Sequence, residues 1–292
     1  MVLSFRLPLL ALVSTSILLP AAVCAELDEK EEKLLKSIRW QEGPTTGRLG
    51  NLAEINVPAG MAFTGADGTK KWMEVSQNLY NEDQLGIVVP MSHESWWTIF
   101  EYNKVGHVKD DEKDKLDAAA LLKSIRENNE EGNKERKRRG WDPLEVVGWE
   151  REPFYDARTN NLTWAVRCRG KDGESVNYSV RILGREGYMS ADLVLGPEEM
   201  AAVIPRFEPL LAGYGYTQGN RYAEYRKGDK LAAYGLTALV AGGAGAVAMK
   251  TGLLAKFWKL IVVAVLGLFA AVKRFFKTIL GWGKNEETIK PT

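Results

Sequence analysis

The sequence is poor in the residues on which many enzymes and small secreted domains depend. It has two cysteines and two histidines among 292 residues, and no G-x-S-x-G nucleophile elbow. So few cysteines exclude a disulfide framework. No Cys, His or Asp spacing typical of a metal site surrounds His93 or His107. We therefore expect no metal, no cofactor and no catalytic residue, and we expect both histidines to be ordinary core or surface residues.

Net charge is also small, but it is unevenly distributed. The whole chain carries +1, whereas residues 26–230 carry 30 Lys and Arg against 36 Asp and Glu, and residues 231–292 carry 8 against 2. Positive charge beside a membrane segment favours the cytoplasmic side. The split therefore favours an exported main domain whose positive C-terminal region lies on the cytoplasmic side of a membrane, with membrane lipid as a partner.

The first 25 residues read as a secretory signal. Arg6 precedes a run rich in Leu, Ala and Val, and Val23 and Ala25 supply small residues at a cleavage site. The alternatives are an uncleaved anchor or, less favoured because Val23 precedes Cys24, a lipoprotein signal. After cleavage Cys168 would be the only cysteine, and its place in an alternating apolar run predicts a small buried residue.

The stretch "GGAGAVAMKT" (242–251) resembles a nucleotide-binding loop. A phosphate loop ending at Lys250-Thr251 would need glycines where Ala244 and Met249 stand, and no carboxylate follows Gly245 at the dinucleotide spacing. Both nucleotide readings therefore fail. The 19 residues from Leu231 to Met249 carry no charge, and a run of this length is long enough for a membrane helix.

The glycines of this run are then expected to be packing residues. Ala238, Gly242 and Ala246 recur every four positions and form a small-residue stripe along a helix. Such a stripe allows close approach of another helix, either from a membrane protein or from a second copy of this chain.

A second apolar block, Leu260 to Val272, follows and is flanked by lysines and Trp258. Snorkelling lysines would extend it to about 257–276. Two arrangements remain open for residues 229–283: one span plus an interfacial helix, or a two-span hairpin. Residues 284–292 are expected to be a polar tail.

The exported region, 26–228, mixes helix and strand patterns. We expect helices over 26–40 and 69–79, and strands over 52–57, 84–89 and 96–102. A helix should begin near Asp114, with Asp114 and Asp117 as its capping signature, and should bury Ala118, Leu121, Leu122 and Ile125. Its basic end (Lys134 to Arg139) suits the helix dipole, so nucleic acid is not an expected partner.

Strands dominate the region after Gly140. Two alternating sets, Leu162/Trp164/Val166/Cys168 and Val176/Tyr178/Val180/Ile182, flank a Lys171-Asp172-Gly173 turn and predict a hairpin with one buried face. A strand over 189–195 follows. A helix should then open at Pro197, turn Met200, Val203, Ile204 and Phe207 inward, and be interrupted by Pro205 or Pro209.

The expected fold class is α+β, an exported antiparallel sheet covered by helices (an α/β sandwich), followed by a C-terminal transmembrane helical segment. Two successive strand-then-helix halves would also fit the pattern. Two groups remain ambiguous. Trp96-Trp97 could face a sugar, but adjacent strand residues point to opposite faces and core packing is the default. Asp110, Asp111 and Glu112 could form a cation patch, although a solvated approach to the next helix explains them better.

Four long stretches resemble one family. They are "VKDDEKDKLDAAALLKSIRE", "RGWDPLEVVGWEREPFYDARTNNLTWAV", "NYSVRILGREGYMS" and "GNRYAEYRKGDKLAAYGLTALVAGGAGAVAMKTGLLAK". Together they resemble the bacterial family of uncharacterised, predicted membrane-anchored proteins called domain of unknown function 2167, over nearly all of residues 35–275. The resemblance implies a Gram-negative exported domain tethered by a C-terminal membrane segment, with a fold similar to the α/β/α sandwich of the photosystem oxygen-evolving subunit P. It implies no catalytic residues.

These observations favour a non-catalytic binding or scaffold protein in the cell envelope. The alternative is an envelope-acting hydrolase or transferase. A binding protein needs an exposed apolar or aromatic groove, whereas an enzyme needs Asp, Glu or His side chains gathered in one cleft.

Overall fold

The computed structural model describes residues 29–92 and 94–241, in which groups of consecutive strands are separated by helices. The strands are β1 (Gln41–Glu42), β2 (Thr45–Leu49), β3 (Ala53–Val57), β4 (Met61–Gly65), β5 (Gln84–Pro90), β6 (Trp97–Asn103), β7 (Glu145–Asp156), β8 (Asn161–Gly170), β9 (Gly173–Leu183), β10 (Tyr188–Leu195) and β11 (Tyr214–Tyr216). The helices are α1 (Glu29–Lys36), α2 (Ala66–Val75), α3 (Ala118–Arg138), α4 (Met200–Ala212) and α5 (Leu236–Val240).

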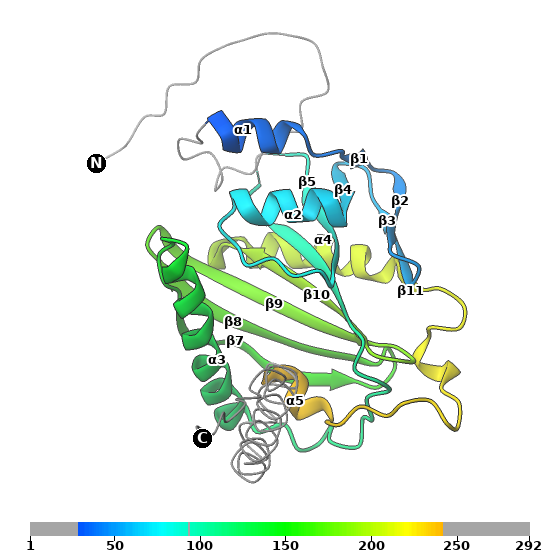
Figure 1. The fold of residues 1–292 in the computed structure, drawn as a ribbon. Coiled ribbons are helices and arrows are strands. Elements are labelled where there is room, and N and C mark those ends of the chain that lie inside the picture. The colour runs from blue at the N-terminus through cyan, green and yellow to red at the C-terminus, as the bar shows by residue number, and fades with distance from the viewer. Residues whose placement is uncertain (1–28, 93, 242–292) are drawn as a thin grey trace, which may run out of the picture. The chain divides into compact units, whose positions relative to one another are not determined.

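An eight-stranded antiparallel sheet is the centre of this domain. Its strand order is β1-β4-β5-β6-β10-β9-β8-β7, and a smaller sheet has the order β11-β3-β2 (Figure 1). The chain lays down β4 to β6 in sequence, then β7 to β10, and β10 returns to pair with β6 along its length. Helices cover both faces of the large sheet. The predicted α+β class with an antiparallel sheet is therefore confirmed.

The large sheet separates two apolar cores. On one face, α4 and the small sheet pack against residues such as Phe63, Phe100 and Met189. On the other face, α1 and α2 pack against residues such as Ile87 and Ile99. Trp96 belongs to the first core and Trp97 to the second. Adjacent extended residues thus point to opposite faces, and the default of core packing for both tryptophans is confirmed.

The β8–β9 hairpin forms as predicted, but its turn is one residue shorter. Gly170 pairs with Gly173, so only Lys171 and Asp172 lie in the loop, and Cys168 stands opposite Ser175. A three-residue turn would have set Cys168 opposite Val176. Because a shift of one residue moves a whole alternating set to the other face, the expectation of one shared buried face is wrong. The Leu162 set and the Val176 set are both buried, on opposite faces of the sheet.

Helix α4 continues through both of its prolines, contrary to expectation. Val203, Phe207 and Leu210 are buried on its inner side. Pro205 and Pro209 lie four residues apart on the exposed side. The missing N–H groups therefore leave carbonyls where water can reach them, and the apolar inner side holds the helix together.

The three other helices that the sequence predicts differ at their ends. Helix α1 ends at Lys36, whereas the prediction extended to residue 40. Asp117, not Asp114, caps α3, since its side chain accepts the Ala120 N–H at 3.0 Å. Residues 110–115 form a separate turn before the helix. Helix α2 spans 66–75 rather than 69–79, because Gln77 has a φ of +52° that cannot continue a right-handed helix.

The described start of the expected membrane run, 231–241, is not one continuous helix. Leu231 forms a parallel bridge with His107, and only Leu236–Val240 is helical. The Glu112 carboxylate accepts the Thr237 N–H at 2.9 Å and so caps this short helix. Within residues 29–92 and 94–241, no helix is long and apolar enough to cross a membrane. Ala238 is buried in α5, whereas Gly242 and Ala246 lie outside the described residues, so the stripe stays a prediction.

Candidate functional site

The described histidine is a structural residue. His107 is 8% exposed and lies between the rings of Tyr222 and Tyr225, with centroid distances of 4.5 and 4.3 Å. Its Nδ1 lies 3.2 Å from the Arg185 carbonyl oxygen, and burial lowers the pKa of His107 below its usual value of 6.5. The part of the chain that the structure describes has no group of His, Cys, Asp or Glu able to hold a metal ion. His93 lies outside that part.

The acidic stretch before α3 is engaged within the domain. Asp110 accepts a hydrogen bond from the Tyr155 hydroxyl at 3.2 Å, and Glu112 caps α5. Neither a cation patch nor a purely solvated lead-in describes these two carboxylates. Cys168 is buried and its pKa is raised by that burial, which confirms the predicted buried cysteine.

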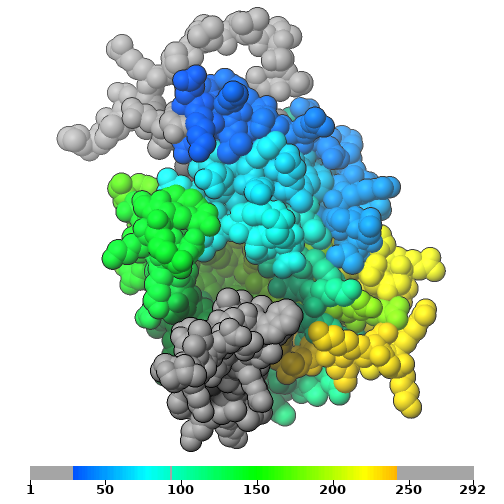
Figure 2. Space-filling view, viewed as in Figure 1, coloured from blue at the N-terminus to red at the C-terminus, as the bar shows by residue number. Residues whose placement is uncertain are grey.

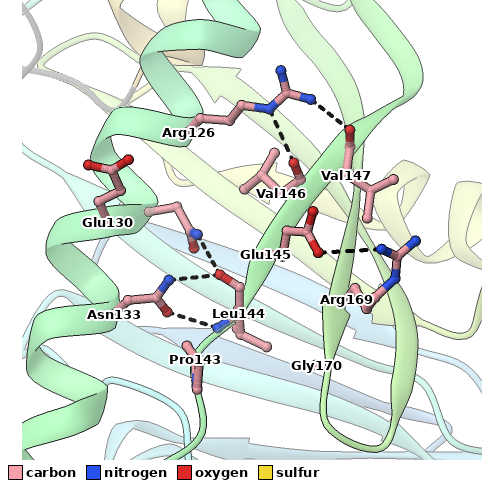
Figure 3. A pocket seen from close by; sticks show the side chains of 11 residues that line it. Arg126, Glu130, Asn133, Pro143, Leu144, Glu145, Val146, Val147, Arg169 and Gly170 are labelled. Carbon is pink, nitrogen blue, oxygen red and sulfur yellow. Dashed lines mark hydrogen bonds and ion pairs between the residues drawn. The ribbon is translucent and has the colours of Figure 1, made fainter.

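A pocket of about 660 Å³ lies between α3 and the start of β7 (Figure 3). Its polar side chains bond to the backbone of residues 144–147. Asn129 and Asn133 donate to the Leu144 carbonyl at 2.6 and 2.8 Å, and Asn133 also accepts the Leu144 N–H. Arg126 donates to the carbonyls of Val146 and Val147 at 3.2 and 2.7 Å.

This α3–β7 contact closes an edge of the sheet. Strand β7 is the last strand of the large sheet, and open backbone groups on an edge invite pairing with other chains. Arg126, Asn129 and Asn133 recur at three- and four-residue spacing, so they lie on one side of α3 and reach the same strand. The polar groups of this pocket are therefore occupied by the fold, and we do not assign a ligand to it.

The second pocket, of about 520 Å³, is a better candidate and is named here the α4 groove. It lies between α4 and strands β7 to β9 on the face that carries the first core. The lining residues used below are Arg151, Phe154, Asn161, Tyr178, Phe207 and Leu211. Its volume is within the range of small-molecule sites. Apolar and aromatic side chains thus line the groove together with charged and uncharged polar ones.

Two of the polar groups, Arg151 and Tyr178, are fixed by neighbours. Arg151 donates from Nη1 to the Tyr178 hydroxyl at 3.0 Å, and its guanidinium carbon lies 4.2 Å from the centroid of the Phe154 ring. Burial raises the pKa of Tyr178, although Arg151 opposes that effect, so the hydroxyl keeps its proton at neutral pH. Phe154 is nevertheless 38% exposed, which is unusual for a phenylalanine in a folded domain.

A further polar group of the groove, the Asn161 amide, has an unpartnered oxygen. Oδ1 of Asn161 is shielded from solvent and accepts no hydrogen bond from any described residue. Asn161 opens β8 directly after the turn at 157–160, and it stands opposite Ile182 of β9 and Asp156 of β7. A buried acceptor left without a donor costs about 1–3 kcal/mol. Asn161 also lines the α4 groove, so a ligand whose donor reached this oxygen would remove that cost.

The sequence pattern did not identify this groove. Strand β7 has register shifts at three places and little alternation, so neither the strand nor its exposed Phe154 was predicted. The signal that was present is local: Asn160 and Asn161 follow Arg158 and Thr159 in a polar turn just before a strongly alternating strand. Such a position places polar side chains at the rim of a sheet face.

Comparisons with known proteins give a family and two slight structural likenesses. No curated protein matches the chain. Cyanobacterial PsbP (CyanoP) from Synechocystis sp. PCC 6803 is similar with a TM-score of 0.37 and 9% identity, over 62% of this chain and 92% of that one. The Ran-binding protein Mog1p of Saccharomyces cerevisiae is similar with a TM-score of 0.29 and 11% identity, over 65% and 99%. These likenesses support no inference about function.

The family match covers most of the chain and includes every residue of the α4 groove. The matching model is described as "Protein of unknown function (DUF2167)", and it spans residues 41–273. The family predicted from the four sequence stretches is therefore confirmed, and this chain belongs to the DUF2167 family of proteins of unknown function.

Proposed function

We propose that this chain is a binding protein of the bacterial cell envelope, without catalytic activity of its own, and that the α4 groove takes an uncharged apolar group bearing one N–H or O–H donor. The observation that carries the proposal is the shielded, unpartnered Oδ1 of Asn161 within an aromatic groove. A ligand donor placed there would satisfy this oxygen, while its apolar body would cover Phe154 and Leu211.

The charges around the groove favour an uncharged ligand. Its charged lining residues are Arg151, Asp156 and Glu208. Asp156 forms an ion pair with Arg158 at 3.1 Å, and Arg151 is held by Tyr178 and Phe154. With Arg158 included, the formal charges cancel. The groove therefore has no net charge that would favour an anion or a cation over an uncharged ligand, and an ion entering it would lose hydration.

The location in the envelope rests on sequence. The secretory signal pattern, the negative main region and the positive C-terminal region support a periplasmic domain held at the inner membrane, with membrane lipid as a partner. A membrane protein or a second copy of the chain is the proposed partner for the Ala238, Gly242 and Ala246 stripe.

The enzyme alternative requires titratable groups gathered in one cleft. In the α4 groove, Asp156 is bound to Arg158 and Tyr178 is bound by Arg151, so neither is poised to accept a proton from a substrate. Glu208 is the other carboxylate of the lining, and a single carboxylate does not form the cluster of titratable groups that the enzyme alternative requires.

A photo-crosslinking experiment tests it. The full chain in lipid nanodiscs is irradiated with benzophenone-4-carboxamide, an uncharged aromatic amide, or with plain benzophenone, which lacks the N–H donor. Mass spectrometry then locates the labelled peptides. We expect label on the peptides that contain β9 and α4, and a preference for the amide of about tenfold, the size of one satisfied buried hydrogen bond.

Two variants and one control make the result specific. Asn161→Leu should abolish the preference for the amide while plain benzophenone still labels the groove, which also shows that the variant is folded. Phe154→Ala should weaken labelling by both probes. Glu130→Ala, in the α3–β7 pocket, should change neither. Label spread evenly over the chain, or an amide preference that survives Asn161→Leu, would disprove the proposal.

A further inference from the structure

A patch of polar residues interrupts the face of the large sheet that α1, α2 and α3 cover. Helices α1 and α2 pack over β4 to β6, and α3 packs along β7. Between them the strands are visible at the floor of a recess, deeper than the cyan residues of α2 and the green residues of α3 (Figure 2). The strands that cross this gap are β6, β10, β9 and β8.

Register places the polar side chains of these strands together. Glu101, Ser190 and Arg181 are direct cross-strand neighbours on β6, β10 and β9. Asp192 and Ser179 are neighbours in the next row on the same face. Residues two apart along a strand share a face, and strands lie about 4.8 Å apart. These five residues, called the polar patch, therefore span two strand spacings, about 10 Å.

The centre of the patch is an arginine held in a fixed orientation. Arg181 donates from Nη1 to Asp192 Oδ1 at 2.8 Å, and its guanidinium lies 4.7 Å from the centroid of the Trp164 ring. Ser179 donates to the same Oδ1 at 2.5 Å. The planar guanidinium is thus clamped between a carboxylate and an indole, which leaves its other edge free to bond elsewhere.

Several donors and acceptors of the patch are unused by the described part of the chain. Nε and Nη2 of Arg181 and Oδ2 of Asp192 make no hydrogen bond there. The two side chains are only 15% and 27% exposed, so they are largely withdrawn from water but can still be reached from it. Glu101 accepts amide hydrogens from Asn81 and Asn103 at 2.8 and 3.2 Å, which orients its carboxylate at the rim.

We propose that the polar patch binds a neutral saccharide. Each sugar hydroxyl both donates and accepts a hydrogen bond, so neighbouring hydroxyls match a guanidinium edge that only donates beside a carboxylate oxygen that only accepts. Fixed, half-buried donors and acceptors bind such a ligand with little loss of side-chain entropy. The site is separate from the α4 groove, which lies on the opposite face of the sheet.

The charges of the patch disfavour other ligands. Arg181 and Asp192 neutralise each other, and Glu101 leaves one negative charge, so a phosphate or carboxylate would be repelled. The guanidinium beside Asp192 likewise repels a divalent cation from that carboxylate. An uncharged polyhydroxyl ligand is subject to neither of these repulsions.

Saturation-transfer NMR on the full chain in lipid nanodiscs tests the inference, because nanodiscs avoid detergents with sugar headgroups. The probes are maltotetraose and tetra-N-acetylchitotetraose. We expect transfer to at least one of them. Asp192→Asn, which keeps the shape of the side chain, should weaken binding by about tenfold, the effect of one charged hydrogen bond.

Glu101→Gln, at the rim and outside the buried ion pair, is the second variant and should weaken binding severalfold without changing the unfolding midpoint. Arg151→Lys in the α4 groove is the control and should bind as the wild type does. Lack of transfer to both saccharides, or equal affinity of the wild type and both patch variants, overturns the inference. Displacement of the saccharide by millimolar calcium or inorganic phosphate would also overturn it, since it would identify an ion site. The groove proposal is unaffected by these outcomes.

Discussion

Two phenylalanines in the α4 groove should separate stability from binding. Phe207 is fully buried and packs edge-on against Tyr178 at 5.9 Å, whereas Phe154 is 38% exposed. Truncating a buried phenylalanine removes its transfer energy and leaves a cavity, at a cost of about 3–5 kcal/mol. Truncating Phe154 removes part of its burial and its contact with Arg151, and we expect a cost of about 1 kcal/mol.

The assay is urea unfolding of the full chain in nanodiscs, followed by tryptophan fluorescence, for the wild type, Phe207→Ala and Phe154→Ala. Domains of this kind have a free energy of unfolding of about 5–15 kcal/mol, so Phe207→Ala should lower the midpoint markedly with an unchanged slope. Phe154→Ala should move it little. The same proteins are labelled with benzophenone-4-carboxamide, and here Phe154→Ala should show the larger defect per unit of lost stability.

Equal losses of stability for the two variants would refute this reasoning, because they would mean that burial does not distinguish the two side chains. A loss below 1 kcal/mol for Phe207→Ala would do so as well. If Phe154→Ala labelled like the wild type, Phe154 would have no part in binding even if the stability difference held.

Three further predictions follow from particular contacts. Pro205→Ala should raise the free energy of unfolding by about 1–3 kcal/mol, because it restores an N–H group inside α4. Pro197→Ala, at a helix start where proline is tolerated, should leave the free energy of unfolding nearly unchanged in the same urea titration. Hydrogen bonds from Arg185 are the main reason that the pKa of Asp229 is lowered to about 2. The ionised Asp229 therefore stabilises the fold fully above about pH 4, and this stabilisation is lost as pH falls toward 2. Pepsin should cut residues 221–232 increasingly between pH 4 and 2, and the Asp229→Asn variant should be cut already at pH 4. Gly242→Leu should partly reduce cysteine crosslinking along the 238/242/246 side, by an interaction of about 1 kcal/mol, and crosslinks equally strong at Leu239 and Val247 would contradict the stripe.

Strands with strict alternation were predictable from the sequence, but their pairing was not. The sets beginning at Leu162 and Val176 identify β8 and β9 correctly. Which face of the sheet each set occupies depends on whether Gly173 belongs to the turn or to the strand, and the amino-acid sequence does not decide between these two possibilities. With apolar cores on both faces of the sheet, both registers are compatible with burial of both sets: a three-residue turn would place them on one face, and the observed two-residue turn places them on opposite faces.

The candidate site was less predictable than the fold because it depends on residues that do not alternate. Strand β7 carries Arg151 and Phe154 within a bulged, charged stretch that has no strand period. The polar patch joins residues from β6, β9 and β10 that are distant in sequence, and only register brings them together. The start of α3 was predicted within three residues: Asp114 was expected to be the cap with Asp117 three residues later, and Asp117 is the cap.

The apolar run 231–249, which the sequence predicts to be a membrane helix, begins inside the folded domain, and this limits where an anchor can lie. His107 binds the backbone on both sides of Leu231, with His107 N–H to Lys230 O at 2.8 Å and Ala232 N–H to His107 O at 2.9 Å. Asn128 donates to the carbonyl of Ala241. If the domain keeps these contacts, the apolar residues left over before Lys250 are 242–249, and a helix of that length is about 12 Å long, well short of the 30 Å hydrocarbon core.

An anchor would then have to come from the second block, residues 257–276, which reaches about 30 Å with its flanking aromatic and basic residues. Alkaline-phosphatase fusions distinguish the two arrangements, since the enzyme is active only in the periplasm. A fusion after Lys230 should be active in either case. If the domain holds residues 231–241, a fusion after Lys256 should also be active and one after Lys277 inactive. If the span instead begins at Leu231, as the charge pattern alone predicts, the fusion after Lys256 should be inactive, and the contacts of His107 and Asn128 with this segment would have to be broken in the membrane-bound protein.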